Sequence, residues 1–112
     1  LALTINGRLS AAAQAHSENM AASQFFSHDD PQGRKPWQRM EAAGYRYTMA
    51  AENIGAGYEQ PERMVAEWMK SPGHRANILN CNLTETGVGF VRMGENRPKG
   101  SYRAYWTQDF GG

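Results

Sequence analysis

Two histidines and one glutamate, far apart along the chain, are the residues best suited to chemistry. His28 stands in the turn-rich stretch 27–33, Glu52 lies between small and polar residues, and His74 follows a Pro-Gly pair. Neutral imidazoles and a carboxylate are suitable ligands for zinc or a similar divalent metal. Without a metal, the same groups can act as general acid and base, since histidine titrates near neutral pH.

The spacing of these three residues does not by itself identify a metal site. They are widely separated, and no HExxH pattern links them. A histidine in a loop is more often a structural hydrogen-bonding group, and a glutamate beside an asparagine is more often a turn or cap residue. From the residues alone, a structural role is therefore favoured over metal binding.

No nucleophile can be recognised in the sequence. Ser17, Ser27 and Ser71 have no acid–histidine pair that sequence spacing would place beside them. Cys81 would serve only if the fold brought a histidine to it. This lack of a nucleophile argues against a serine or cysteine hydrolase.

The positions of the elements that must hold these residues can be predicted from hydrophobic spacing. Asn6 or Ser10 can cap a first helix, in which Leu9, His16 and Met20 recur at helical spacing. His16 lies on the apolar face of that helix. We therefore interpret it as a core or interface histidine and not as a ligand.

Three further helices are predicted around proline residues. Pro36 can open a short helix and Pro61 a longer one, because proline is tolerated at the first helical position. Residues 74–79 indicate one more short helix. Trp37 and Trp68 are predicted to be core residues.

Two strands are predicted at the end of the chain. Residues 87–91 alternate between glycine and larger residues, and residues 102–110 place Trp106 and Gln108 on one face. Residues 51–58 contain only weak evidence for a strand. Helices followed by antiparallel strands predict the α+β class, with helices packed on a small sheet.

Composition limits the possible classes of protein. The chain has 112 residues, which suits one domain, and a formal net charge of +1. Its scattered basic residues give no reason to expect nucleic acid as a partner. No apolar run approaches the roughly 20 residues of a membrane helix. The single cysteine, Cys81, excludes an internal disulfide and is predicted to be partly buried.

Four short motifs occur in one order. They are Phe-Phe-Ser-His (25–28), Glu-Asn-Ile-Gly (52–55), Ser-Pro-Gly-His-Arg (71–75) and Tyr-Trp-Thr-Gln (105–108). In this order the chain resembles the CAP superfamily (SCP, or cysteine-rich secretory protein, antigen 5 and pathogenesis-related 1), in its bacterial form. The resemblance implies an α-β-α sandwich, with a small antiparallel sheet between helical layers. It also implies a single domain over residues 1–112 without the family's first helix, and a secreted or cell-envelope location.

The resemblance also implies a set of cleft residues. His28, Glu52 and His74 match three members of the family's tetrad of two histidines and two acids, and the histidines are implied ligands of a divalent metal, possibly zinc. The acidic residue nearest to the fourth position is Glu67. It precedes Trp68, projects roughly 100° away from it on a helix, and is better interpreted as solvated. Asn77, Trp106 and Gln108 are the other candidate cleft residues.

Three functions are consistent with these residues. The first is a secreted binding module whose cleft holds a divalent metal and an unidentified small-molecule, lipid or protein ligand. The second is a cell-envelope interaction domain in which the polar cluster is purely structural. The third is a metal-assisted peptidase with Glu52 as general base. We favour the binding module and rank the enzyme last.

Overall fold

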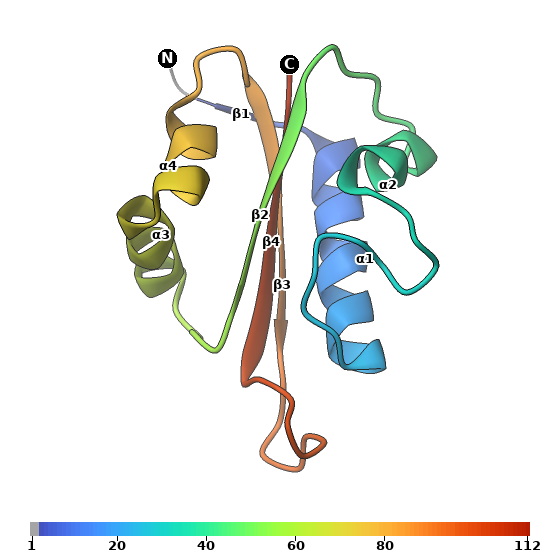
Figure 1. Cartoon of the computed structure of the whole chain (residues 1–112), viewed down its shortest axis with the longest axis vertical. Coiled ribbons are helices and arrows are strands. Elements are labelled where there is room, and N and C mark those ends of the chain that lie inside the picture. The colour runs from blue at the N-terminus through green and yellow to red at the C-terminus, as the bar shows by residue number, and fades with distance from the viewer. Residues whose placement is uncertain (1–2) are drawn as a thin grey trace.

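The computed structural model describes residues 3–112 as a sheet between two helical layers (Figure 1). Helices α1 and α2 cover one face of the sheet, and α3 and α4 cover the other. The predicted α+β class and α-β-α sandwich are confirmed. The elements, in chain order, are β1 (Thr4–Ile5), α1 (Gly7–Ser23), α2 (Pro36–Ala42), β2 (Ala50–Ala56), α3 (Pro61–Lys70), α4 (Pro72–Leu79), β3 (Glu85–Arg92) and β4 (Ala104–Gly111).

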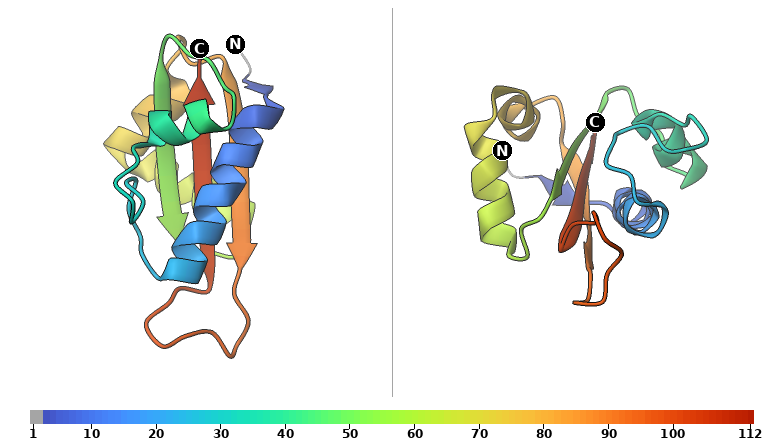
Figure 2. Two further views of the ribbon diagram at one scale, coloured as in Figure 1. Left: turned by 90° about the vertical axis from the view of Figure 1, so that its right-hand side faces the viewer. Right: turned by 60° about the horizontal axis from the view of Figure 1, so that its bottom comes forward.

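The predicted antiparallel sheet is formed by β2, β4 and β3, and β1 adds one parallel pairing, so the whole sheet is mixed. Its strand order is β1-β3-β4-β2. β4 is antiparallel to both of its neighbours, while the two-residue β1 runs parallel to β3. β1 is too short to show a pattern in the sequence. The polar loop between β3 and β4 projects beyond the sheet (Figure 2).

β2 is a full strand of seven residues, although its sequence contains little sign of one. It pairs with β4 along its whole length, from Ala50 opposite Gly111 to Ala56 opposite Tyr105. The neighbouring strand therefore supplies the hydrogen bonds that stabilise β2, which local propensity does not provide. β2 lies at an edge of the sheet, so loops and helices from both layers can reach it.

Helix α1 begins as predicted and packs directly on the sheet. The side chain of Asn6 accepts hydrogen bonds from the backbone N–H groups of Arg8 (2.9 Å) and Leu9 (3.1 Å), which caps the helix. The apolar side of α1 lies against β3 and β4 (Figure 2). Two glycines of β3, Gly87 and Gly89, allow this contact because a Cβ atom at either would collide with the backbone of α1.

Two predictions about single residues are wrong. Trp68 is buried as expected, but Trp37 is 46% exposed. The short α2 faces the core with Arg39 and Met40, and a helical rotation of roughly 100° per residue places Trp37 beside that face. Cys81 is exposed, because it lies in the loop between α4 and β3.

The prolines predicted to open helices do so, Pro36 in α2 and Pro61 in α3. Pro72 likewise starts α4, directly after Ser71 ends α3. Among residues 3–112, no helix combines the length and apolarity that crossing a membrane requires.

Candidate functional site

Glu52 is the centre of a buried ionic cluster. It lies on β2 with its side chain only 1% exposed. The Nη2 atom of Arg39, on α2, donates to both carboxylate oxygens at 2.9 Å each. Because Arg39 is 6% exposed, both partners of this ion pair are shielded from water. Removing either partner of such a pair would leave the other charge buried without compensation and would strongly destabilise the fold.

His28 is held by the same cluster. Its Nδ1 lies 2.9 Å from Oε1 of Glu52, and its backbone carbonyl accepts a hydrogen bond of 2.7 Å from Arg39 Nη2. A carboxylate only accepts, so Nδ1 carries the proton and Nε2 carries the lone pair. The side chain of His28 is 47% exposed. The cluster therefore orients an accessible imidazole whose Nε2 is free to bind a ligand.

His74 is oriented in a similar way from the other layer. Its Nδ1 lies 2.9 Å from the hydroxyl oxygen of Ser71, at the junction of α3 and α4. Partial burial lowers the pKa of His74, and the positive charge that His28 would carry when protonated acts in the same direction. The two histidines are thus close enough to affect one another, and His74 is neutral at pH 7. The structure brings both rings to the β2 edge, from opposite sides of the sheet.

Two asparagines connect α4 to β2. Asn53 donates to the backbone carbonyl of His74 at 3.2 Å. Asn77 donates to the side-chain oxygen of Asn53 at 2.9 Å and to the carbonyl of Glu52 at 3.4 Å. Asn77 therefore lies beside the site, where it positions backbone and does not bond to a histidine ring.

Asp109 is a buried acid directly opposite Glu52 in the strand register. It is fully buried, and neither carboxyl oxygen accepts a hydrogen bond from any residue of the described chain. Burial, and then the hydrogen bond and charge of Glu52, raise the pKa of Asp109 well above its ordinary value. Asp109 is therefore the member of the pair that more readily holds a proton, and in its protonated form it donates toward Glu52.

Glu52 is the charged member of this pair of acids. Burial would raise its pKa, but hydrogen bonds from His28 and Asp109 and the charge of Arg39 outweigh that effect, so its pKa is lowered. The proton stays on Asp109 because Arg39 and His28 contact only Glu52.

Protonated Asp109 makes the stability of the fold depend on pH. An aspartate in an unfolded chain titrates near about 3.9, whereas the raised pKa of folded Asp109 keeps its proton in place to higher pH. Between these two pKa values the folded chain holds the extra proton, so the free energy of unfolding falls as pH rises. We expect Asp109→Asn to gain stability relative to the wild type as pH rises above about 4.

Urea unfolding of both proteins across a pH series measures this difference. Groups that do not interact with Asp109 titrate alike in both proteins and cancel. The lowered pKa of Glu52 gives a stabilisation that is fully present above its unfolded pKa and is lost as pH falls through its folded pKa, so it changes only at and below the acid end of the series. A difference that does not change between about pH 4 and 8 would show that Asp109 is ionised in the fold.

The remaining candidate residues lie elsewhere. Glu67 accepts a hydrogen bond of 3.0 Å from Lys70 on α3, as expected for a solvated flank residue. Trp106 donates to the carbonyl of Tyr58 at 2.7 Å and packs against α3. Gln108 lies opposite Asn53 on the same face of the sheet as Trp106. The structure therefore does not bring these three residues to the buried cluster around Glu52.

Sequence reasoning missed two members of the cluster, Arg39 and Asp109. Arg39 is one of many scattered basic residues, and nothing in its neighbours indicates burial. Alternation along the last strand places Asp109 on the same face as Tyr105, but it does not reveal a second acid opposite it. Within residues 3–112, no group of three or more His, Cys, Asp or Glu side chains could hold a metal ion. A cation here would have two histidines as its protein ligands.

The arrangement can be compared with known proteins. A family model for CAP, the cysteine-rich secretory protein family, matches residues 1–110. The chain belongs to the CAP family. This CAP domain is 41% identical over 108 residues to the uncharacterised protein YkwD of Bacillus subtilis, covering 96% of the domain and 38% of YkwD. It is 33% identical to YlbC, an uncharacterised membrane protein of the same bacterium, covering 85% of the domain and 24% of YlbC. The domain thus spans well under half of each relative.

Solved structures share the fold of this CAP domain. An extracellular SCP-domain protein of Bacillus anthracis superposes with a TM-score of 0.84 at 29% identity, covering 99% of the domain and 34% of that protein. An outer surface protein of Borrelia burgdorferi gives 0.85 at 20% identity, covering 99% of the domain and 77% of that chain. These likenesses support a bacterial-type SCP domain.

Proposed function

We propose that this CAP domain is an extracellular binding module in which His28 and His74 hold a divalent cation, zinc being the first candidate. The arrangement of the two rings supports the proposal. In each ring Nδ1 has a hydrogen-bond partner, Glu52 for His28 and Ser71 for His74, so Nε2 remains for a ligand. Metal-binding histidines typically have their second nitrogen oriented in this way. An extracellular location is supported by the extracellular protein of Bacillus anthracis.

The residues fit a cation that keeps some of its positions for other ligands. Two neutral imidazoles suit zinc, and a zinc ion usually takes four ligands. The Glu52 carboxylate is no ligand in this arrangement, because Arg39 and His28 occupy its oxygens. A bound cation would supply positive charge and positions for an oxygen ligand. His28 and His74 hold it, and the buried cluster fixes the orientation of His28.

The peptidase alternative has less support than the binding module. A general base must take up a proton from water. Both oxygens of Glu52 already accept hydrogen bonds from Arg39, and its lowered pKa makes it a weak base. The second alternative is a purely structural cluster. It is supported by the hydrogen bonds of Arg39, on α2, to Glu52 on β2 and to the backbone carbonyl of His28 in the loop. The zinc titration described next tests this alternative as well.

Zinc titration by calorimetry tests the proposal directly. All proteins should carry Cys81→Ser, because an exposed thiol binds zinc by itself. We expect one-to-one binding to the metal-stripped domain and loss of that binding in the double variant His28→Ala, His74→Ala.

Ser71→Ala is the intermediate variant. It removes the partner of His74 Nδ1 but keeps both rings, and we expect zinc affinity to fall about tenfold, the low end of the effect of such partners. A double histidine variant that binds zinc as the parent does would contradict the proposal and favour the structural alternative.

A further inference from the structure

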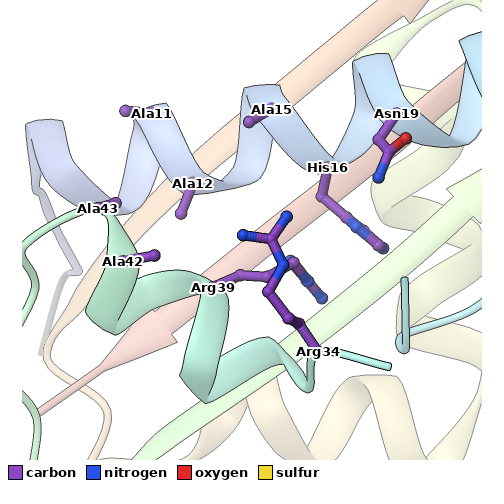
Figure 3. A pocket seen from close by; sticks show the side chains of 9 residues that line it. All are labelled: Ala11, Ala12, Ala15, His16, Asn19, Arg34, Arg39, Ala42 and Ala43. Atoms are coloured by element: carbon purple, nitrogen blue, oxygen red, sulfur yellow. The ribbon is translucent and has the colours of Figure 1, made fainter. Parts of the chain in front are cut away.

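A second site lies on the other side of Arg39. Between α1 and α2 there is a cavity of about 230 Å³ (Figure 3). His16 and Asn19 project into this space from α1, and Arg39 projects into it from α2. The floor is buried, with Ala12, His16 and Arg39, while Ala11, Ala15, Arg34 and Ala42 at the rim are exposed. A small molecule can therefore enter from solvent.

The cavity contains hydrogen-bond donors that the protein does not use. Arg39 is almost fully buried, and its Nη2 serves Glu52 and the His28 carbonyl. Its Nε and Nη1 atoms have no hydrogen-bond partner anywhere in residues 3–112. A buried guanidinium donor bonds most strongly to an oxygen that carries negative charge. These unused donors indicate a ligand with a carboxylate or a similar anionic group.

The cavity also contains one unused acceptor. The Nε2 atom of His16 lies 2.8 Å from the carbonyl oxygen of Ser27, so Nε2 carries the proton and Nδ1 carries the lone pair. Nδ1 is buried and finds no partner in the described part of the chain. Burial lowers the pKa of His16 and outweighs the opposing charge of Glu52, and the charge of Arg39 acts in the same direction as burial, so the ring is neutral at pH 7. A ligand with a hydroxyl or N–H group can donate to this atom.

The walls and the charges set the size and charge of the ligand. Five alanines line the cavity, so its walls are apolar and admit a short carbon chain. Arg34, at the rim, already pairs with Asp30 at 2.7 Å, and Arg39 pairs with Glu52. Because one carboxylate already balances each guanidinium, the site does not favour a ligand with more than one negative charge.

We infer that the cavity between α1 and α2 binds a small carboxylate with a short apolar body and one hydrogen-bond donor. Its carboxylate lies against Arg39 and Arg34, and its donor faces Nδ1 of His16. A 2-hydroxy acid such as lactate has this chemistry. The site is separate from the proposed cation site, since neither His28 nor His74 lines the cavity.

Lactate and isobutyrate are matched probes, since a methyl group replaces the hydroxyl in isobutyrate. The measurement is an NMR titration that follows the side-chain Nε–H signal of Arg39 and the ring nitrogens of His16. We expect lactate to shift both residues saturably. Isobutyrate is expected to bind about fivefold more weakly, because one hydrogen bond is lost. Inorganic phosphate, an anion without an apolar body, is expected to bind more weakly than lactate.

Ala15→Leu and Ala22→Leu form a matched pair of variants. Both positions are exposed on α1, but only Ala15 lines the cavity, and neither change touches the ion pair of Arg39. We expect Ala15→Leu to weaken lactate binding at least about fivefold, which corresponds to the roughly 1 kcal/mol at the low end of the cost of overfilling a packed site, and Ala22→Leu to leave it unchanged. The inference is wrong if neither acid shifts Arg39 saturably or if Ala15→Leu binds lactate as the wild type does. It is also wrong if isobutyrate or phosphate binds as tightly as lactate.

Discussion

Replacing Glu52 by glutamine should lower the free energy of unfolding by about 3–5 kcal/mol, the usual cost of leaving one partner of a buried ion pair alone. Glutamine keeps the shape of the side chain but removes its charge. Arg39, at 6% exposure, would then hold its positive charge away from water without a counter-ion. His28 would also lose the carboxylate that accepts from its Nδ1. Urea unfolding at pH 7 measures the change.

Asp109→Asn is the control for this prediction. It makes the same chemical change in the neighbouring acid, at a position that is equally buried. Because the fold favours the protonated form of Asp109, the substitution removes no charge, and we expect no loss of stability at pH 7, in line with the relative gain expected above about pH 4. Equal losses in the two variants would show that the charge is shared between the acids.

This difference also affects how the peptidase alternative can be tested. A variant of Glu52 that lost turnover would not by itself identify a general base. The same substitution disturbs Arg39 and the orientation of His28. Activity of Glu52→Gln must therefore be compared at a temperature at which the variant is fully folded.

Replacing Gly87 by alanine should destabilise the fold by about 3 kcal/mol, at the upper end of the usual cost of overpacking. A Cβ atom there would collide with the backbone nitrogen of Ser10 and the carbonyl carbon of Leu9. No rotamer change can relieve a contact with backbone, so α1 must move away from β3. Since α1 carries Leu9 and other core residues, the movement would also open the core.

Gly94→Ala is the matched control, measured by the same thermal or urea unfolding. Gly94 lies in the loop after β3, and nothing approaches its ideal Cβ position within 4 Å. We expect its stability to stay within about 0.5 kcal/mol of the wild type, as for surface substitutions in general. If Gly87→Ala were equally neutral, the direct packing of α1 on β3 would not be needed for stability.

Part of the site could be predicted from local sequence. His28, Glu52 and His74 each stand in a short motif of a recognisable family, and the structure places all three at the β2 edge. The partners of these residues were not predictable in the same way. Arg39 contacts Glu52 across 13 positions, and Asp109 faces it across a strand pair. No local pattern encodes a contact between segments that are distant in sequence.

The sequence alone determined the elements whose signals are local. Asn6 caps α1, Pro36 and Pro61 open helices, and alternation identifies β3 and β4, because capping, proline geometry and strand periodicity act within a few residues. Tertiary structure alone decided that residues 50–56 form a strand, since β4 supplies their hydrogen bonds. It also decided which acid is charged. Glu52 and Asp109 are both buried carboxyl groups, and only the position of Arg39 in space assigns the charge to Glu52 and the proton to Asp109.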